Sequence, residues 1–392
     1  MIRKLDELEL EGKTVFVRVD FNVPIDQGRI TEPHRIDSAL PTLRKILERA
    51  RKIIVASHLG RPDGKIVAKY SMAPVHHYLE QAMKQSVIMA PDCVGPEVEL
   101  LARDQQNRIV LLENLRFHKE EEKNDPGFSK ALAALADIYV DDAFGAAHRA
   151  HASIAGMAAF FTDKAAGLLM QRELDYLTPI LGDPKKPFVT ILGGAKVSDK
   201  IGVIKNLLPK VDALLIGGGM AYTFLKAQGI EIGKSLVEED RVNLAGDLLQ
   251  EAARRGVRLL LPIDHVTGDV EKRAPQTCNG GIPAERVGLD IGPATTDLFA
   301  HEIRKAKTVL WNGPVGLFEV SPYDQGSRAL AEALAENYPR LVSIIAGGDT
   351  VAAVSAAGVG DKISHLSTGG GATLEFLEGK ELPGIKALEI AR

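Results

Sequence analysis

The sequence has few of the residues that build disulfide frameworks and no segment that spans a membrane. Its 392 residues include two cysteines, and aromatic residues make up 5% of the chain. Cys93 and Cys278 lie far apart without the spacing of metal ligands, which argues against a disulfide scaffold and for a reducing compartment. No apolar run approaches the ~20 residues that cross a bilayer. Residues 1–13 alternate charged and apolar side chains instead of forming a signal-peptide core, so we expect a cytoplasmic protein.

Neither sign of charge dominates the chain. Lys and Arg number 48 against 52 Asp and Glu, which gives a formal net charge of −4. Because no overall basic field points to nucleic acid or an anionic membrane, any anion site must come from local groups of Arg, Lys and backbone N–H. Hydrophobic residues make up 45% and charged residues 26%, as in folded globular proteins. The length favours two domains of about 150–200 residues each.

The chain alternates short apolar strands with amphipathic helices. Strands are predicted at 14–19, 52–56, 109–112, 138–140, 188–192, 213–216, 258–262, 308–311, 341–345 and 363–366. Several are near-continuous runs of Ile, Leu and Val, which is typical of strands covered on both faces. Helical patterns between them occupy 38–50, 129–136, 240–254 and 296–306. This repetition predicts an α/β fold with parallel sheets and right-handed crossovers.

A break near the middle divides the chain. Residues 168–181 are predicted to form a helix, and the Gly-Asp-Pro-Lys-Lys-Pro segment at 182–187 ends it before a new series of strands begins. We interpret this helix as the connector between two α/β domains. The expected boundaries are 1–167 for the first domain, 168–182 for the interdomain helix and 183–379 for the second domain.

Cationic side chains gather in the first half. Open parallel sheets bind ligands at the carboxyl ends of their strands, and polar residues follow several strands of this half directly. The cationic and hydrogen-bonding groups offered there are Arg35, His58, Arg61, Arg116 and Arg149. Guanidinium groups grip phosphate through paired hydrogen bonds, so this half favours a small, highly charged anion.

Glycines take the equivalent place in the second half. Its strands run into Gly193-Gly194-Ala195-Lys196, Gly217-Gly218-Gly219, Asn312-Gly313-Pro314, Gly347-Gly348-Asp349-Thr350 and Gly369-Gly370-Gly371. Backbone N–H groups at such helix N-termini, together with the helix dipole, hold nucleotide phosphates. A site for a compact polyanion in one half and a nucleotide site in the other indicate phosphoryl transfer across a cleft.

Several of these segments also have an ordinary structural explanation. Residues 20–24 could form a plain turn. Asp349 and Thr350 are common N-cap residues, although a carboxylate beside a nucleotide phosphate also suits Mg²⁺. Lys196 and Lys200 are expected on one face of the first turns of a helix, where lysines oppose the helix dipole and need an anionic partner.

Two further motifs are not assigned to chemistry. His148 and His151 lie three residues apart without another convincing ligand, so we do not expect them to hold a metal. Residues 229–235 are similar to a P-loop but are one residue short of it, and they follow a helix where a P-loop follows a strand. A turn is predicted there.

The loops together resemble a known family. Residues 18–24, Arg-Val-Asp-Phe-Asn-Val-Pro, and residues 58–62, His-Leu-Gly-Arg-Pro, resemble two signatures of phosphoglycerate kinases. Further matching segments follow in the family's order, at 142–151, 193–200, 311–319, 347–350 and 367–372, so the resemblance, to the bacterial type, covers essentially the whole chain. Position 146 is Ala where the family usually has a hydroxyl residue; we expect little effect, since its neighbours match.

This resemblance implies two Rossmann-like three-layer domains with parallel sheets, joined by a helix and a hinge around a central cleft. It also implies that residues 380–392 return to the first domain. The implied reaction is the reversible transfer of a phosphoryl group from 1,3-bisphosphoglycerate to ADP, giving 3-phosphoglycerate and ATP with Mg²⁺, in glycolysis and gluconeogenesis. The implied partners are these small molecules, with no nucleic acid or membrane, and a monomer is expected.

The resemblance also assigns roles to residues. Catalytic roles fall to Arg35, Lys196, Lys200 and Gly370. The 3-phosphoglycerate site comprises Asp20, Asn22, Arg35, His58, Leu59, Gly60, Arg61, Arg116 and Arg149. The nucleotide site comprises Lys200, Gly217, Asn312, Pro314, Glu319, Gly347, Gly348, Asp349 and Thr350, with Glu319 at the ribose and Asp349 at Mg²⁺.

The implied chemistry needs no general base. In the ATP-consuming direction the nucleophile is a carboxylate, which with a pKa near ~4 is already ionised at pH 7. Catalysis therefore falls to alignment and charge stabilisation. Hinge closure would join the two sites and keep water from the acyl phosphate.

Two other classes of protein are weighed against this one. A nicotinamide-dependent oxidoreductase predicts a G-x-G-x-x-G turn with an acidic residue about 20 positions on, and we find no such turn. A two-lobed binding protein of the periplasmic type needs an export signal, which residues 1–13 do not provide. A coupled assay with ATP and 3-phosphoglycerate separates the three.

Overall fold

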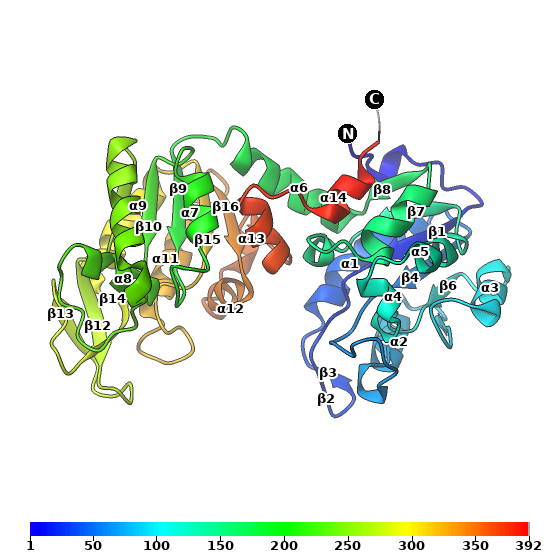
Figure 1. The fold of residues 1–392 in the computed structure, drawn as a ribbon, viewed down its shortest axis with the longest axis horizontal. Coiled ribbons are helices and arrows are strands. Elements are labelled where there is room, and N and C mark those ends of the chain that lie inside the picture. The colour runs from blue at the N-terminus through cyan, green and yellow to red at the C-terminus, as the bar shows by residue number, and fades with distance from the viewer. Residues whose placement is uncertain (391–392) are drawn as a thin grey trace. The chain divides into compact units, whose positions relative to one another are not determined.

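In the computed structural model, which describes residues 1–390, the apolar runs of the first 170 residues form one parallel sheet (Figure 1). Its six strands are ordered β5-β6-β4-β1-β7-β8, and every neighbouring pair is parallel. Their bounds are β1 Thr14–Arg18, β4 Lys52–Ala56, β5 Ile88–Met89, β6 Ile109–Leu111, β7 Ile138–Asp141 and β8 Lys164–Ala166. The central strands are buried throughout because helices cover both faces.

Amphipathic helices supply that cover. In α1 (His34–Leu47) the buried residues recur every three or four positions, as a helix with one apolar face requires. This face and that of α2 (Ala73–Met83) join β1 and β4 in one hydrophobic core. The remaining helices of this part are α3 Pro96–Arg103, α4 Lys119–Glu122 and α5 Pro126–Ala133. A small hairpin, β2 (Ile25–Asp26) with β3 (Arg29–Ile30), precedes α1.

A second parallel sheet forms from the later apolar runs. Its order is β11-β10-β9-β15-β16-β17. The bounds are β9 Phe188–Leu192, β10 Ala213–Ile216, β11 Arg258–Leu260, β15 Thr308–Asn312, β16 Val342–Ala346 and β17 His365–Leu366. Its helices are α7 Ile201–Leu207, α8 Met220–Ala227, α9 Val242–Arg254, α10 Pro293–Lys305, α11 Gln325–Glu336, α12 Gly348–Ala356 and α13 Gly371–Leu377. The α/β class with parallel sheets is thus confirmed.

The structure also contains a small antiparallel sheet that the sequence did not lead us to expect. It is formed by β12 (Asp264–Gly268), β13 (Gln276–Asn279) and β14 (Val287–Ile291), in the order β13-β12-β14. The residues of β13 are largely exposed, so they lack the apolar run that marks the other strands. The sequence analysis also missed β5 and β8, because strands of two and three residues are too short to show a recognisable apolar run.

Contacts within the chain divide it into two compact units. The first comprises Met1–Asp175 with Glu381–Arg392, and the second comprises Tyr176–Lys380. The division falls inside α6 (Leu168–Leu181), whose bounds are those predicted. The C-terminal helix α14 (Pro383–Leu388) lies beside β8 in Figure 1, and the N–H of Gly384 donates to the carbonyl of Ala147 at 2.8 Å.

In each unit the strand order reverses beside the first strand. From β1 the chain moves to β4 on one side and later to β7 on the other, and from β9 it moves to β10 and later to β15. Such reversals leave a crevice at the carboxyl ends of the two flanking strands, which is where open α/β sheets bind ligands. No helix among residues 1–390 is long and apolar enough to cross a membrane.

Candidate active site

The reversal point of the first unit is lined by charged groups that begin with Arg18. This arginine is the last residue of β1 and is fully buried. Its Nε donates to Ser153 Oγ at 2.8 Å, and its Nη2 lies 3.2 Å from Nδ1 of His58, just beyond β4. Glu121 accepts hydrogen bonds from the N–H and hydroxyl of Ser153, at 2.9 and 2.5 Å. A polar network inside the unit thus holds Arg18 at the carboxyl end of the central strand β1.

Asp20 lies two residues after Arg18 and pairs with Arg35. Nη1 of Arg35, in the first turn of α1, donates to Oδ2 of Asp20. The Asp20 side chain is about 10% exposed and that of Arg35 about 36%, so the guanidinium keeps access to solvent while one face is held. Asn22 Oδ1 accepts the N–H of Gly60 at 2.9 Å, which joins the loop after β1 to the loop after β4.

Arg116 reaches the same place from β6. Its Nη1 donates to the carbonyl of Gly60 at 2.7 Å, and its side chain is almost fully buried. Asn114 organises this turn, because its side-chain oxygen accepts from the N–H groups of Leu59 and Arg116, at 3.2 and 3.0 Å. Burial and then the charge of Arg149 lower the pKa of Arg116 to about 10. The guanidinium groups of Arg116 and Arg149 therefore lie close enough for their charges to repel each other.

The same positive charges lower the pKa values of the histidines in this region. Burial, then Arg18, Arg116 and Arg149, lower the pKa of His58 well below its usual value. Burial, then the same arginines, lower the pKa of His151 to about 3. Both imidazoles are therefore neutral near pH 7, and the net excess of guanidinium charge suits an anionic ligand.

The remaining residues expected in this site lie on its loops. Leu59 is buried, whereas Arg61 is exposed at the end of the same loop. Gly60 has a φ of 62°, and a Cβ at this position would meet the ring of Tyr70 at 2.3 Å, so only glycine fits. Arg149 follows η4 (Phe144–Ala146), and its Nε donates to Nε2 of His148 at 3.2 Å. Of the predicted set, Arg61 and Arg149 are not hydrogen-bonded to the other members, although the charge of Arg149 acts on Arg116.

At the reversal point of the second unit, two backbone loops touch. A Cβ on Gly193, after β9, would lie 2.1 Å from the carbonyl oxygen of Pro314, after β15. Gly313, next to Pro314 in the same loop, has a φ of 95°, and a Cβ there would lie 2.2 Å from the carbonyl oxygen of Gly193. Gly217, after β10, would press a Cβ against Val315 at 2.7 Å. These glycines bring three strand ends together and leave backbone facing the crevice.

Polar side chains fix the adjoining loops of the second unit. Nζ of Lys200 donates to Oδ1 of Asn312, whose Nδ2 donates to the carbonyl of Ala346 at 2.8 Å. Thr350 Oγ1 accepts the N–H of Gly313 at 2.7 Å. Burial lowers the pKa of Lys200, opposed by the nearby charges of Asp199 and Asp349. The end of β15 is thereby tied to the start of α12.

One local prediction for these loops was wrong, and one structural alternative is not realised. Lys196 and Lys200 share no helical face, because residues 193–200 form turns and α7 begins only at Ile201 with Lys200 as its N-cap. The loop is instead held by Glu238, which accepts from the N–H and hydroxyl of Ser198 at 3.0 and 2.6 Å. The N-cap of α12 is Gly347, with a φ of 90°, and not Asp349 or Thr350. Residues 229–235 do lie in a turn region after α8, as predicted.

The start of α12 provides a carboxylate at a helix N-terminus. Asp349 is exposed in the first turn, so its carboxylate fits a hard cation such as Mg²⁺ that also binds phosphate oxygens. Glu319 is likewise exposed, in the loop after β15. Gly370, the N-cap of α13, has φ 53° and ψ −117°, a conformation that only glycine adopts readily.

Sequence reasoning missed several residues that complete the first site. Glu121, Asn114 and Ser153 were not singled out, and Arg18 entered only as part of a motif. A signal was present for Arg18, since an arginine that ends the apolar strand Thr-Val-Phe-Val-Arg and is covered on both faces requires an internal partner. Nothing in the local pattern around Glu121, inside a run of charged residues, indicated that its side chain is fully buried.

Comparison with known proteins adds the family. A model of the family described as "Phosphoglycerate kinase" matches residues 5–380. A phosphoglycerate kinase of Koribacter versatilis is 55% identical, with 98% of each chain covered. A protein of Triticum aestivum named "Phosphoglycerate kinase, cytosolic" is 52% identical, with 99% of this chain and 98% of its own covered.

Solved structures agree with the sequence relatives. The phosphoglycerate kinase of Coxiella burnetii superposes with a TM-score of 0.90 at 42% identity, and 99% of each chain is covered. The enzyme of Pyrococcus horikoshii OT3 gives a TM-score of 0.84 at 29% identity, with 99% of this chain and 98% of the other covered. Similarity therefore extends over both units and not over one of them alone.

Proposed function

The chain belongs to the phosphoglycerate kinase family and catalyses reversible, Mg²⁺-dependent phosphoryl transfer between 1,3-bisphosphoglycerate and ADP, and from this premise we propose which of its residues carry the reaction. The observation that carries the assignment is the convergence of Arg18, Arg116 and Arg149 on two neutral histidines in the first unit. Carboxylates offset part of the positive charge of this region, since Asp20 pairs with Arg35 and Oε1 of Glu122 lies 3.4 Å from Nε of Arg116. The remaining excess of guanidinium groups suits the phosphate and carboxylate of 3-phosphoglycerate.

The 3-phosphoglycerate site is assigned to the first unit. Arg61, Arg116 and Arg149 bind its charged groups, and His58 donates or accepts a hydrogen bond as a neutral imidazole. Asp20 and Asn22 position the loops, since one holds Arg35 and the other holds Gly60. Leu59 and Gly60 shape the backbone around the ligand.

The nucleotide site is assigned to the second unit. Gly347, Gly348 and Thr350 present the N-terminus of α12 to the phosphates, and Gly370 presents that of α13. Gly217, Asn312 and Pro314 line the crevice, and Glu319 binds the ribose. Asp349 would hold Mg²⁺, which supplies charge neutralisation at the nucleotide phosphates when bound.

Charge stabilisation during transfer is assigned to three cations. Arg35 reaches the phosphoryl group from the first unit, and Lys196 and Lys200 act from the second. Lys200 is held by Asn312, and its partly buried ammonium loses less solvation when an anion arrives. No residue acts as a general base, because the attacking carboxylate of 3-phosphoglycerate is ionised at neutral pH.

Substrates bound on two separate units must be brought together, so we assign a hinge to α6 and the adjoining segments. The support lies inside the first unit, where the first turn of α6 is anchored on Asp142, the first residue of the loop that leads from β7 to Arg149. Small-angle scattering should show compaction when both substrates are present. Identical profiles for the free and the doubly liganded protein would overturn the hinge.

The location is assigned to the cytoplasm. The wheat relative carries "cytosolic" in its name. Both cysteines are free thiols, as expected in a reducing compartment. Fractionation of cells that express the chain tests this assignment, and recovery in an exported fraction would contradict it.

The assay that tests the function follows ADP production from ATP and 3-phosphoglycerate in a coupled system. We expect turnover that requires both substrates and Mg²⁺. ATP consumption that is independent of 3-phosphoglycerate would remove the acceptor assignment.

A further inference from the structure

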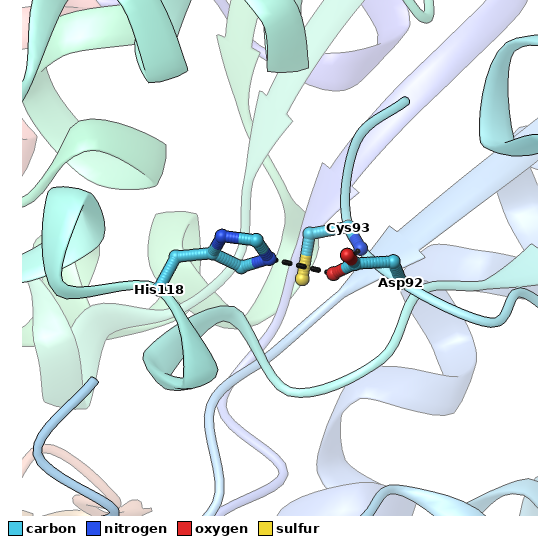
Figure 2. A group of neighbouring side chains, drawn as sticks. All are labelled: Asp92, Cys93 and His118. Atoms are coloured by element: carbon cyan, nitrogen blue, oxygen red, sulfur yellow. Dashed lines mark hydrogen bonds and ion pairs between the residues drawn. The ribbon is translucent and has the colours of Figure 1, made fainter. Parts of the chain in front are cut away.

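A second group of reactive side chains lies in the first unit and takes no part in the site described above. Asp92 and Cys93 follow β5, and His118 follows η3 (Leu115–Phe117). One ligand atom from each of the three lies within 4.8 Å of the others, and no other group of three His, Cys, Asp or Glu side chains among residues 1–390 converges in this way. Figure 2 shows the three side chains meeting from two segments of the chain.

The two polar members are already in contact. Oδ1 of Asp92 lies 2.6 Å from Nε2 of His118 and also accepts the N–H of Cys93 at 2.6 Å. In Figure 2 the sulfur of Cys93 points toward the line that joins these two side chains. The imidazole also stacks on Phe128, with ring centroids 4.9 Å apart and an interplanar angle of 30°. Three potential donors thus face one small volume.

The donor set selects the kind of ion. A thiolate, an imidazole nitrogen and a carboxylate oxygen are the protein ligands of Zn²⁺, and a tetrahedral ion with bonds of about 2.0–2.3 Å keeps its ligand atoms about 3.5 Å apart. To reach that spacing, the Asp92–His118 pair must open from 2.6 Å and the longer distances, which extend up to 4.8 Å, must close. The shifts needed are about 1 Å, which side-chain rotations of Asp92 and His118 supply because both are partly exposed. Mg²⁺ and Ca²⁺, which take oxygen ligands, do not suit a sulfur donor.

The surrounding charge is negative. Asp92, Glu113 and Glu121 all act on the Cys93 thiol, which is fully buried and donates to the carbonyl oxygen of Glu113 at 3.0 Å. The Glu113 carboxylate is held in place by the hydroxyl of Ser71 at 2.8 Å and by the N–H of Met72 at 2.7 Å. A divalent cation at the cluster would be stabilised by these carboxylates where a proton now resides on sulfur.

We propose that Asp92, Cys93 and His118 form a three-ligand site for a borderline divalent metal ion, Zn²⁺ or Co²⁺, whose fourth position is filled by water. On binding, the S–H bond of Cys93 is broken, its proton passes to solvent and the sulfur–metal bond replaces it. No electron is transferred. The site is separate from the Mg²⁺–nucleotide site, which lies on the other unit.

The test uses the full-length, metal-free protein without nucleotide or phosphate, titrated with Co²⁺ and followed by absorption spectroscopy. A thiolate-to-cobalt charge-transfer band and intense d–d bands of a four-coordinate ion should appear together and saturate at one equivalent, and Zn²⁺ should displace them. Absence of the charge-transfer band at saturating Co²⁺ would overturn the proposal.

Two cysteine variants form the matched pair. Cys93→Ser should lose the charge-transfer band, whereas Cys278→Ser, which changes the partly exposed thiol on β13, should retain it. A band that persists in Cys93→Ser, or that disappears in Cys278→Ser, would assign the sulfur ligand elsewhere and refute the site.

A third variant keeps the test decisive if the buried Cys93→Ser substitution disturbs folding. His118→Asn changes a partly exposed side chain and should weaken Co²⁺ binding by at least about tenfold, the lower limit even for an outer-shell partner of a metal ligand. Binding as tight as in the unchanged protein would contradict the proposal. Circular dichroism and turnover with Mg²⁺ and ATP report whether each variant is folded.

Discussion

Asp142 accepts the backbone N–H of Leu169 at 2.9 Å, and this bond anchors the first turn of α6 to the end of β7. The same oxygen accepts the N–H of Met170 at 3.1 Å, and Gly167 leaves no room for a Cβ, which would approach Asp142 to 2.2 Å. A carboxylate at a helix N-terminus is stabilised by the helix dipole, yet burial prevails and raises the pKa of Asp142 to about 6.

This raised pKa predicts how stability depends on pH. The folded state binds the Asp142 proton more tightly than the unfolded state, whose carboxyl has the ordinary aspartate pKa of 3.8. Stability from this group is therefore full below that pH and is lost as pH rises to about 6. The difference of roughly two pKa units corresponds to about 3 kcal/mol. Urea unfolding of wild type and Asp142→Asn at several pH values should show their difference shrinking by about this amount.

The histidines also make the free energy of unfolding depend on pH, with the opposite sign. Their contribution is the same in wild type and in Asp142→Asn, so it cancels in the difference between the two proteins. Because the pKa of His151 is lowered, protonation favours the unfolded state, and stability from that group falls as pH decreases below the usual histidine range. If the difference in stability between wild type and variant stayed constant between about pH 4 and pH 7, the pKa of Asp142 would not be raised in the folded state.

Replacement of Arg35 should slow the chemical step. We expect Arg35→Ala to lower kcat by about 10²–10⁴, the effect of losing an oxyanion donor or an arginine finger. Steady-state kinetics with both substrates at saturation measures it. Arg103→Ala removes an exposed arginine paired with Glu99 and should leave kcat unchanged. A decrease of less than about fivefold in Arg35→Ala would exclude the catalytic role, since it falls short of the contribution of such donors.

Ligand binding should restore the basicity of the histidines. The pKa of His151 is about 3 in the free protein because burial and three arginines oppose its charge. A bound polyanion offsets the arginine charges, so the pKa of both His58 and His151 should rise when 3-phosphoglycerate is added. NMR titration of the imidazole signals records this, with exposed His301 on α10 as the internal reference. Unchanged titration curves at saturating ligand would place the anion elsewhere.

Gly370 and Gly371 offer a comparison in which only backbone conformation differs. A Cβ meets nothing within 4 Å at either position, but Gly370 alone has a positive φ, of 53°. Gly370→Ala should distort the start of α13, at an expense of about 1–3 kcal/mol, and lower kcat/KM for ATP by at least about tenfold. Gly371→Ala should be close to wild type. Equal effects of the two substitutions would show that this backbone conformation is not needed for nucleotide binding.

The sequence sufficed for elements whose signal is local and failed where partners are distant. Phe188–Leu192 and Ala213–Ile216 were predicted to the residue, because buried parallel strands are continuous apolar runs that polar or glycine residues end. The antiparallel strand Gln276–Asn279 was missed because its side chains are polar and mostly exposed. Its stability comes from pairing with β12, which no local pattern encodes.

The same contrast holds for the site. His58, Arg116 and Arg149 could be proposed because polar residues directly after buried strands point to the ligand edge of a sheet. The spacing of Lys196 and Lys200 fits a helical face, but the chain there forms turns held by Glu238, forty residues away. The burial of Glu121 depends on Ser153 and Arg18, so only the folded chain shows it.

The central claim is that the first unit binds 3-phosphoglycerate and the second binds the nucleotide. Calorimetric titration of two variants with each ligand separately tests this claim most directly. Arg149→Ala should weaken 3-phosphoglycerate binding by at least about tenfold, the value of one charge-assisted hydrogen bond, and leave Mg²⁺–ADP binding unchanged. Asp349→Asn should weaken Mg²⁺–ADP binding and leave 3-phosphoglycerate binding unchanged. Loss of the same ligand in both variants, or the reverse pairing, would contradict the account.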